Sequence, residues 1–182
     1  LYGAGALGGV INFTTKDPSD FLKAEDTAVL RLKGMYDSNK WGFMTSAVGA
    51  VRLSENTEFL VNGLFRKSND IEDGHGIEIP GSAFSSFSGL AKVVHHFGED
   101  KEQAVRLSYQ RWQSDADDTQ YSQTNTAGFG TIDRDITDQT VVLNYENPAS
   151  DNPYLDLAVN LSFSDTQVEQ KNSSLGAFSP SQ

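Results

Sequence analysis

The glycines at the start of the chain have the spacing of a phosphate-binding loop. Gly3, Gly5 and Gly8 spell G-x-G-x-x-G within the opening run LYGAGALGGVINFTTK. A dinucleotide site needs a strand before such glycines and a helix after them, because the N–H groups of the helix N-terminus bind the pyrophosphate. The run VINFTT that follows is rich in β-branched and aromatic residues, which predicts a strand instead. The context therefore argues against a nucleotide site.

Carboxylates gather between positions 115 and 138, where they could offer oxygen ligands to a cation. They are Asp115, Asp117, Asp118, Asp133, Asp135 and Asp138. Their spacing lacks the D-x-[DN]-x-[DN]-G pattern and the terminal glutamate of a calcium loop, so a solvated loop is the favoured interpretation and calcium the alternative. The chain has no G-x-S-x-G or H-E-x-x-H motif and no nucleophile set beside a base. We therefore expect a non-enzyme without a metal site.

Composition narrows the range of partners. The 182 residues carry a net charge of -11 and contain no cysteine. The 14 lysines and arginines are scattered along the chain, so nucleic-acid binding is not expected. No apolar run of about 18 residues is present, which excludes a membrane-spanning helix, and no signal-peptide pattern is visible.

Alternation of apolar and polar side chains is the strongest structural signal. Every second residue from Leu155 to Phe163 is apolar, and Asp156, Asn160 and Ser162 lie between them. Most of the alternating segments reach the roughly 9–11 residues that a tilted strand needs to cross a bilayer. An all-β fold with a one-sided antiparallel sheet is therefore expected. Seven strands are predicted, at about 28–37, 41–53, 58–69, 88–98, 103–114, 138–147 and 154–169.

The connections between these strands alternate in length, as in barrels with short periplasmic turns and longer external loops. The turns near Ser54, Gly98 and Asn147 are predicted to be periplasmic. The connections 37–40, 71–87 and 115–137 are predicted to be external. Aromatic residues near strand ends predict interfacial girdles, with ordinary sheet packing as the alternative. The outer set is Tyr36, Trp41, Phe43 and Trp112, and the periplasmic set is Phe59, Phe97, Tyr145 and Tyr154.

The opening run resembles the end of the plug domain in the TonB-dependent outer-membrane receptors of Gram-negative bacteria. The runs KDPSDFL (16–22) and GIEIPGS (76–82) are more similar to the haem and haemoglobin receptors of that family. In this motif Gly3, Gly5, Gly8 and Gly9 would permit a tight turn inside a crowded barrel, and direct ligand contact is the alternative. The family segment is close to LYGxGAxGGVINxxTK, which the chain matches at Leu1, Tyr2, Gly3, Gly5, Ala6, Gly8, Gly9, Val10, Ile11, Asn12, Thr15 and Lys16.

The resemblance implies part of a transmembrane antiparallel β-barrel, about 7 of 22 strands, preceded by the last strand of the plug. Residues 1–22 would be the C-terminal end of the plug and its linker, and residues 23–182 the first part of the barrel. Asp17, Pro18 and Asp20 are expected to belong to this linker, where the proline ends strand pairing and the two carboxylates are solvated, without chemistry. Because the chain opens inside a motif, we expect an internal piece of a longer precursor.

The resemblance also implies a function. The protein would lie in the bacterial outer membrane, in contact with its lipid, and import an iron source with energy from the TonB complex. Haem, or haem taken from haemoglobin, is the favoured cargo and the only cofactor-like ligand expected. The segment that would contact TonB precedes Leu1 in the family, so no partner-binding residue is predicted. The alternatives are a siderophore or other TonB-dependent receptor, and a non-transporting β-sheet binding or adhesin module.

His75 is the candidate ligand-binding residue. It lies between two glycines in DGHGIEIPGS on a predicted external loop, where a neutral imidazole could offer Nε2 to haem iron. A polar turn residue without a ligand is the alternative. His95 and His96 are adjacent, so their side chains are predicted to point to opposite faces of a strand and not to chelate one metal.

Overall fold

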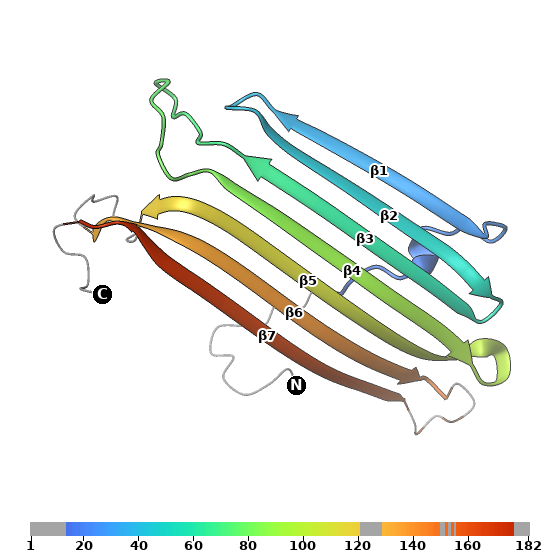
Figure 1. The fold of residues 1–182 in the computed structure, drawn as a ribbon. Helices are drawn as coiled ribbons and strands as arrows, with labels where there is room; N and C mark the ends of the chain where they lie inside the picture. Colours follow the sequence, from blue (N-terminus) through green and yellow to red (C-terminus); the bar gives the residue numbers. More distant parts are fainter. Residues whose placement is uncertain (1–13, 121–128, 150–151, 153, 155, 177–182) are drawn as a thin grey trace.

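The computed structural model describes residues 14–120, 129–149, 152, 154 and 156–176. Seven strands form one sheet in chain order, and every neighbouring pair is antiparallel (Figure 1). The all-β antiparallel fold expected from the sequence is therefore confirmed. The strands are β1 (Ala28–Asp37), β2 (Gly42–Ser54), β3 (Thr57–Ser68), β4 (Phe84–Phe97), β5 (Gln103–Gln120), β6 (Thr131–Asn147) and β7 (Leu157–Ser174), with short 3-10 helices η1 (Pro18–Asp20) and η2 (Glu99–Lys101).

The sheet is open, because β1 and β7 form its two edges. The long β3–β4 connection and the β1–β2 turn lie at one end of the strands, and the β2–β3 and β4–β5 turns lie at the other (Figure 1). This arrangement agrees with the predicted alternation of short turns and longer loops. Across the described segments, neither 3-10 turn nor any other helix is long and apolar enough to cross a membrane.

One face of the sheet is apolar because the strand registers bring the alternating apolar sets side by side. Leu107 pairs with Val93 on one side and Leu143 on the other, and Leu143 pairs with Leu161. We call this the apolar face. Its large side chains are open to the surroundings: Leu161 is 60% and Phe163 69% exposed. The apolar row from Leu157 to Phe163 on β7 extends about 20 Å along the strand.

The opposite face is largely polar and carries the segment 14–27, so we call it the linker face. It presents the intervening residues of each strand, for example Asn62, Ser108, Asn144 and Asn160. Figure 1 shows η1 lying against this far side of the sheet. The few fully buried side chains, Leu60 and Val94 among them, also belong to it.

The largest errors in the predicted strand ends were four strands that were too short at the end of the sheet that carries the β3–β4 loop. β4 begins at Phe84, β5 continues to Gln120, β6 begins at Thr131 and β7 ends at Ser174. The predicted connection 115–137 is consequently mostly strand. The cause is that ladder hydrogen bonds join backbone groups, so pairing continues where the regular alternation of apolar and polar side chains has ended. Asp115 and Asp135 are paired in this extension, and a bulge between Ala116 and Thr119 follows.

Candidate functional site

The segment 14–27 is fastened to the linker face, and its apolar residues explain part of the attachment. Pro18 and Leu22 are buried, and η1 contacts β3. On the same face Leu60 and Val94 are only 2% and 1% exposed. The exclusion of water from these side chains favours the docked arrangement.

Asp17 is the centre of the polar attachment. Lys92 Nζ on β4 donates to Asp17 Oδ1 at 2.8 Å and to the backbone oxygens of Thr15 at 2.9 Å and Lys16 at 3.2 Å. Arg106 Nε on β5 donates to Asp17 Oδ2 at 2.8 Å. The Lys92 side chain is only 4% exposed, so these partners replace the water that an exposed ammonium group would bind.

The electrostatics of Asp17 follow from this geometry. Burial by itself would raise the pKa of the Asp17 carboxyl, but the hydrogen bonds and charges of Lys92 and Arg106 outweigh it and hold the pKa below its usual range. Arg106 also pairs with Glu146, through Nη1 and Oε2 at 2.6 Å. The expectation that Asp17 is merely solvated was therefore wrong: its side chain is 24% exposed and shared between two cations.

A second clamp holds the end of the same segment. Arg52 Nη1 on β2 donates to the backbone oxygens of Ala24 and Asp26, both at 2.9 Å, and Arg52 Nε donates to Glu58 at 3.1 Å. The backbone N–H of Arg52 also donates to the oxygen of Thr27 at 2.8 Å. The segment is thus bound to the sheet at both ends.

Phe21 lies between these two clamps in the sequence, and its ring contacts two cations. Lys16 Nζ is 5.5 Å and Arg31 Cζ 5.2 Å from the centre of its ring. Such cation–π contacts stabilise the position of an aromatic ring. The arrangement contains no nucleophile beside a base. These contacts hold the segment 14–27 against the linker face of the sheet.

The loop that carries His75 is an ordered turn at the far end of the strands. The His75 side chain is 88% exposed, and its Nδ1 lies 3.8 Å from Asp73 Oδ2. Asp73 Oδ1 accepts the backbone N–H groups of His75 at 2.8 Å and Ile77 at 3.0 Å. These bonds, that of Ile77 first, lower the pKa of the Asp73 carboxyl. The surroundings fit a polar turn, and ligand binding by His75 remains a prediction.

The same loop is joined to the β1–β2 turn. Lys40 Nζ lies 2.9 Å from Glu72 and 3.2 Å from Glu78, and these hydrogen bonds raise the pKa of the Lys40 ammonium. Asn39 exchanges hydrogen bonds with the backbone of Glu72, through Nδ2 at 3.0 Å and Oδ1 at 2.9 Å. The two connections therefore form one unit.

The other residues singled out from the sequence are placed by the strand registers. His95 pairs with Thr57, whose Oγ1 is 2.9 Å from His95 Nδ1, whereas His96 takes the opposite face as predicted. Trp112 pairs with Ser88 and Asp138 on the linker face, so its assignment to an outer girdle was wrong. The four glycines Gly3, Gly5, Gly8 and Gly9 lie outside the described residues, and their role stays a prediction.

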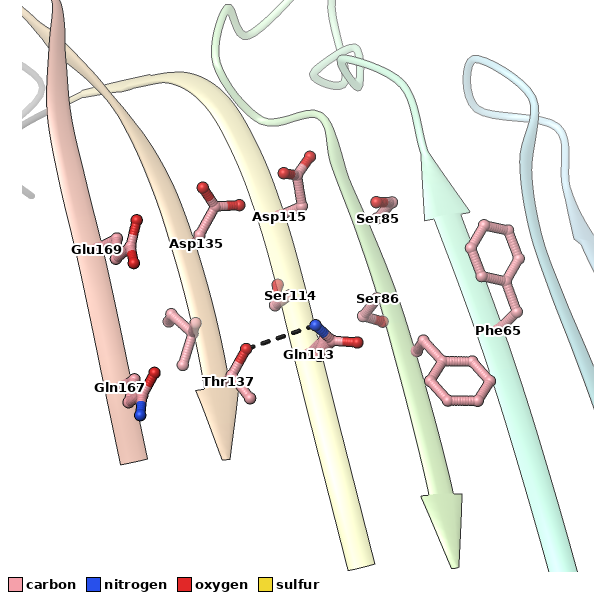
Figure 2. A pocket seen from close by; sticks show the side chains of 12 residues that line it. Phe65, Ser85, Ser86, Gln113, Ser114, Asp115, Asp135, Thr137, Gln167 and Glu169 are labelled. Carbon is pink, nitrogen blue, oxygen red and sulfur yellow. Dashed lines mark hydrogen bonds between the residues drawn. The ribbon is translucent and has the colours of Figure 1, made fainter. Parts of the chain in front are cut away.

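A polar hollow of about 530 Å³ lies on the apolar face, beyond the apolar rows. Figure 2 shows hydroxyl, amide and carboxylate side chains of β4 to β7 around it, with Phe65 at one side. Gln113 Nε2 donates to Thr137 Oγ1 at 3.5 Å within it. Its carboxylates, Asp115, Asp135 and Glu169, do not form a metal-binding group, and no such group occurs elsewhere in the part of the chain that the structure describes.

Comparison with known proteins gives one finding. No family model matches the chain, and no curated protein matches it. Among solved structures the chain is similar to the FrpB iron transporter from Neisseria meningitidis (F3-3 variant), with a TM-score of 0.68 and 21% sequence identity. The likeness is one of fold. It covers 87% of this chain and 26% of the transporter, so the chain spans about a quarter of that protein's length. The open antiparallel sheet is thus arranged like part of a larger transporter.

Proposed function

We propose that this chain forms part of the barrel wall of an outer-membrane receptor that imports an iron source with energy from the TonB complex. The observation that carries the proposal is the two-sided sheet. One face exposes large apolar side chains from neighbouring strands, and the other binds a linker segment. The fold likeness to an iron transporter supports this function, and so does the plug-like motif that precedes the linker.

In this proposal residues 1–22 end the plug and its linker, and residues 23–182 begin the barrel of a bacterial outer-membrane protein. The apolar face contacts the lipid, and the linker face lines the lumen. The polar extensions of β5 and β6 beyond the apolar rows would then stand outside the membrane. The attachment of Asp17 to Lys92 and Arg106 would keep the end of the plug linker on the wall.

Haem, free or taken from haemoglobin, is the proposed cargo, and its support is the similarity of KDPSDFL and GIEIPGS to the haem receptors. The test is growth of a strain that lacks the full-length protein, with haem as the sole iron source. Loss of growth that is restored by the wild-type gene agrees with haem import. Unchanged growth on haem, with a defect on a ferric siderophore, would move the cargo to the siderophore class.

The second candidate is a non-transporting β-sheet binding or adhesin module, favoured by the exposed external loop around His75. Heat-modifiable migration of the full-length protein in detergent gels, together with its location in the outer-membrane fraction, distinguishes the two. A closed barrel migrates differently before and after boiling. A protein that migrates identically and is released as a soluble species would favour the binding module.

A further inference from the structure

Three stacked rings lie on the apolar face, at the end of the sheet that carries the β2–β3 and β4–β5 turns (Figure 1). The His95 and Phe97 rings have centres 5.9 Å apart and planes at 20°, and the Phe97 and Tyr145 rings follow at 6.2 Å and 14°. Because His95 and Tyr145 both pair with Val105 of β5, they share one row of the sheet. The neighbouring row on this face contains Leu107 and lies about 7 Å away. The rings therefore form the margin of the apolar face.

Two further side chains hold the polar atoms of these rings in place. Thr57 Oγ1 lies 2.9 Å from His95 Nδ1, and the Tyr145 hydroxyl donates to Gln103 Oε1 at 3.0 Å. We assign the Thr57 hydroxyl as the donor, because His95 Nδ1 is its one acceptor among the described residues. A neutral imidazole that accepts at Nδ1 carries its proton at Nε2. His95 Nε2 and the Gln103 amide nitrogen are then donors without an acceptor in the described part of the chain.

The position of these two donors fits an anion that continues into an apolar chain. His95 is exposed and stacks on Phe97, and Gln103 pairs with Phe97, so both donor side chains adjoin the same ring. The apolar side chains of the next row begin immediately beyond them. A phospholipid combines a phosphate that accepts hydrogen bonds with acyl chains that such a row would bind.

The charges around the rings also permit an anion. The two carboxylates that directly follow residues of this row, Glu58 and Glu146, lie on the linker face, because side chains alternate along a strand. There Glu58 pairs with Arg52 at 3.0 Å and Glu146 pairs with Arg106 at 2.6 Å. An anion at His95 therefore meets no carboxylate from its own row of the sheet.

We infer that His95 and Gln103 bind the phosphodiester of a phospholipid in the periplasmic leaflet, while its acyl chains lie along the row that contains Leu107. The inference rests on the proposed function, because it requires the apolar face to contact lipid and the short turns to face the periplasm. The phosphate oxygens accept the N–H groups of both side chains in charge-assisted hydrogen bonds. The Tyr145 ring, with its apolar body and polar tip, then lies where headgroups meet hydrocarbon.

Solid-state NMR of the full-length protein tests the contact directly. The protein carries ¹⁵N in its histidine and glutamine side chains and is reconstituted in phosphatidylethanolamine and phosphatidylglycerol bilayers in a buffer without phosphate, so all phosphorus belongs to lipid. A hydrogen bond from His95 Nε2 to a phosphate oxygen places the phosphorus about 4 Å from the nitrogen. We expect ³¹P to dephase the signal of a protonated imidazole nitrogen, and this signal should be lost in His95→Gln.

His96→Gln is the matched control, because it removes the neighbouring imidazole from the opposite face. It should leave the dephased signal in place, whereas Gln103→Leu should weaken the dephasing of His95 Nε2 by removing the second donor. The inference is overturned if the signal lost in His95→Gln shows no dephasing or has the chemical shift of an unprotonated nitrogen. Loss of the dephased signal in His96→Gln, or unchanged dephasing in Gln103→Leu, would overturn this two-donor site as well.

A second measurement on the same bilayers separates this inference from the proposed function. Contacts between the Leu161 methyl groups and the lipid acyl chains report whether the apolar face is in lipid. Leu161 contacts without ³¹P dephasing at His95 would overturn the phospholipid site and leave the proposed function standing. Absence of both would count against the proposed function and overturn the site with it.

Discussion

Replacing Asp17 by asparagine tests the attachment of the linker to the sheet. The carboxylate accepts one hydrogen bond from Lys92 and one from Arg106, both at 2.8 Å. Asparagine keeps one acceptor oxygen, turns a donor toward the other cation and removes the negative charge. When the remaining oxygen faces Arg106, Lys92, whose side chain is 4% exposed, keeps only the backbone oxygens of Thr15 and Lys16.

The free-energy cost of Asp17→Asn for linker docking follows from these contacts. A hydrogen bond to a charged group contributes roughly 1.5–3 kcal/mol, and one of the two is lost outright. Because the Asp17 side chain is 24% exposed, water replaces part of the lost interaction. We therefore expect the docked state of the linker to lose about 2 kcal/mol, which corresponds to roughly a thirtyfold larger open population.

Amide hydrogen exchange of the full-length protein in a bilayer measures this population. The reporting amides are those of Phe21 and Leu22, both bonded to the oxygen of Pro18 at 3.0 Å, and that of Arg52, bonded to Thr27. Their exchange should accelerate by the same factor of roughly thirty when exchange reports the local opening equilibrium. The exchange rates of amides in the centre of β5 and β6 should not change.

Glu25→Gln is the matched control, because it removes the same charge from an exposed position of the same segment. It should leave the exchange of these amides as in the wild type. Unchanged exchange in Asp17→Asn would refute the reasoning, since the apolar contacts of Pro18 and Leu22 would then suffice. An equal acceleration in Glu25→Gln would refute it as well, because net charge rather than the Lys92 and Arg106 bonds would control docking.

Three further predictions follow from the same structure. The pKa of Asp17 is lowered from the ordinary 3.8 in the docked state, so the ionised carboxylate stabilises docking fully at neutral pH, and this stabilisation is lost as the pH falls through the lowered pKa. The amide exchange rates of the linker, corrected for the intrinsic effect of pH, should therefore rise in acid in the wild type and stay constant in Asp17→Asn. Leu161→Arg places a charge on the apolar face and should lower the free energy of unfolding of the full-length protein in lipid by roughly 2–4 kcal/mol. Ser162→Arg places the same charge on the linker face and should lower it far less. Equal losses of unfolding free energy in a urea titration would contradict the assignment of the two faces. Expressed alone, residues 1–182 should associate, because both edges of the sheet and its apolar face are open, and a sharp monomer at all concentrations in sedimentation would disprove this.

The strands were predictable from the sequence wherever one face is apolar. Large apolar residues occupy every second position from Leu157 to Phe163, and a shift of one residue would reverse the two faces. Both the strand and its orientation are therefore encoded locally. The same rule fails at Asp115 and Asp135, where neither face is apolar. There the ladder continues because the neighbouring strand supplies the backbone partners, which no local pattern reveals.

The attachment of the linker was hidden for a related reason. Asp17 follows a recognisable motif and precedes a proline, which reads as an ordinary solvated turn. Its partners Lys92 and Arg106 are 75 and 89 residues away in sequence, and the strand registers alone bring them together. A weak signal existed, because both cations occupy the polar positions of alternating strands. Trp112 shows the opposite error: its closeness to a strand end suggests an interfacial girdle, but its place in the alternation puts its side chain on the linker face.

The most direct test of the account is to ask which face of the sheet contacts lipid. Single spin labels at positions 157 to 164 of the full-length protein in a bilayer report collisions with oxygen, which partitions into lipid, and with a water-soluble nickel chelate. The account predicts a period of two, with high oxygen accessibility at Leu157, Val159, Leu161 and Phe163 and low accessibility at the residues between them. Uniformly high accessibility to the nickel chelate at all eight positions would contradict it.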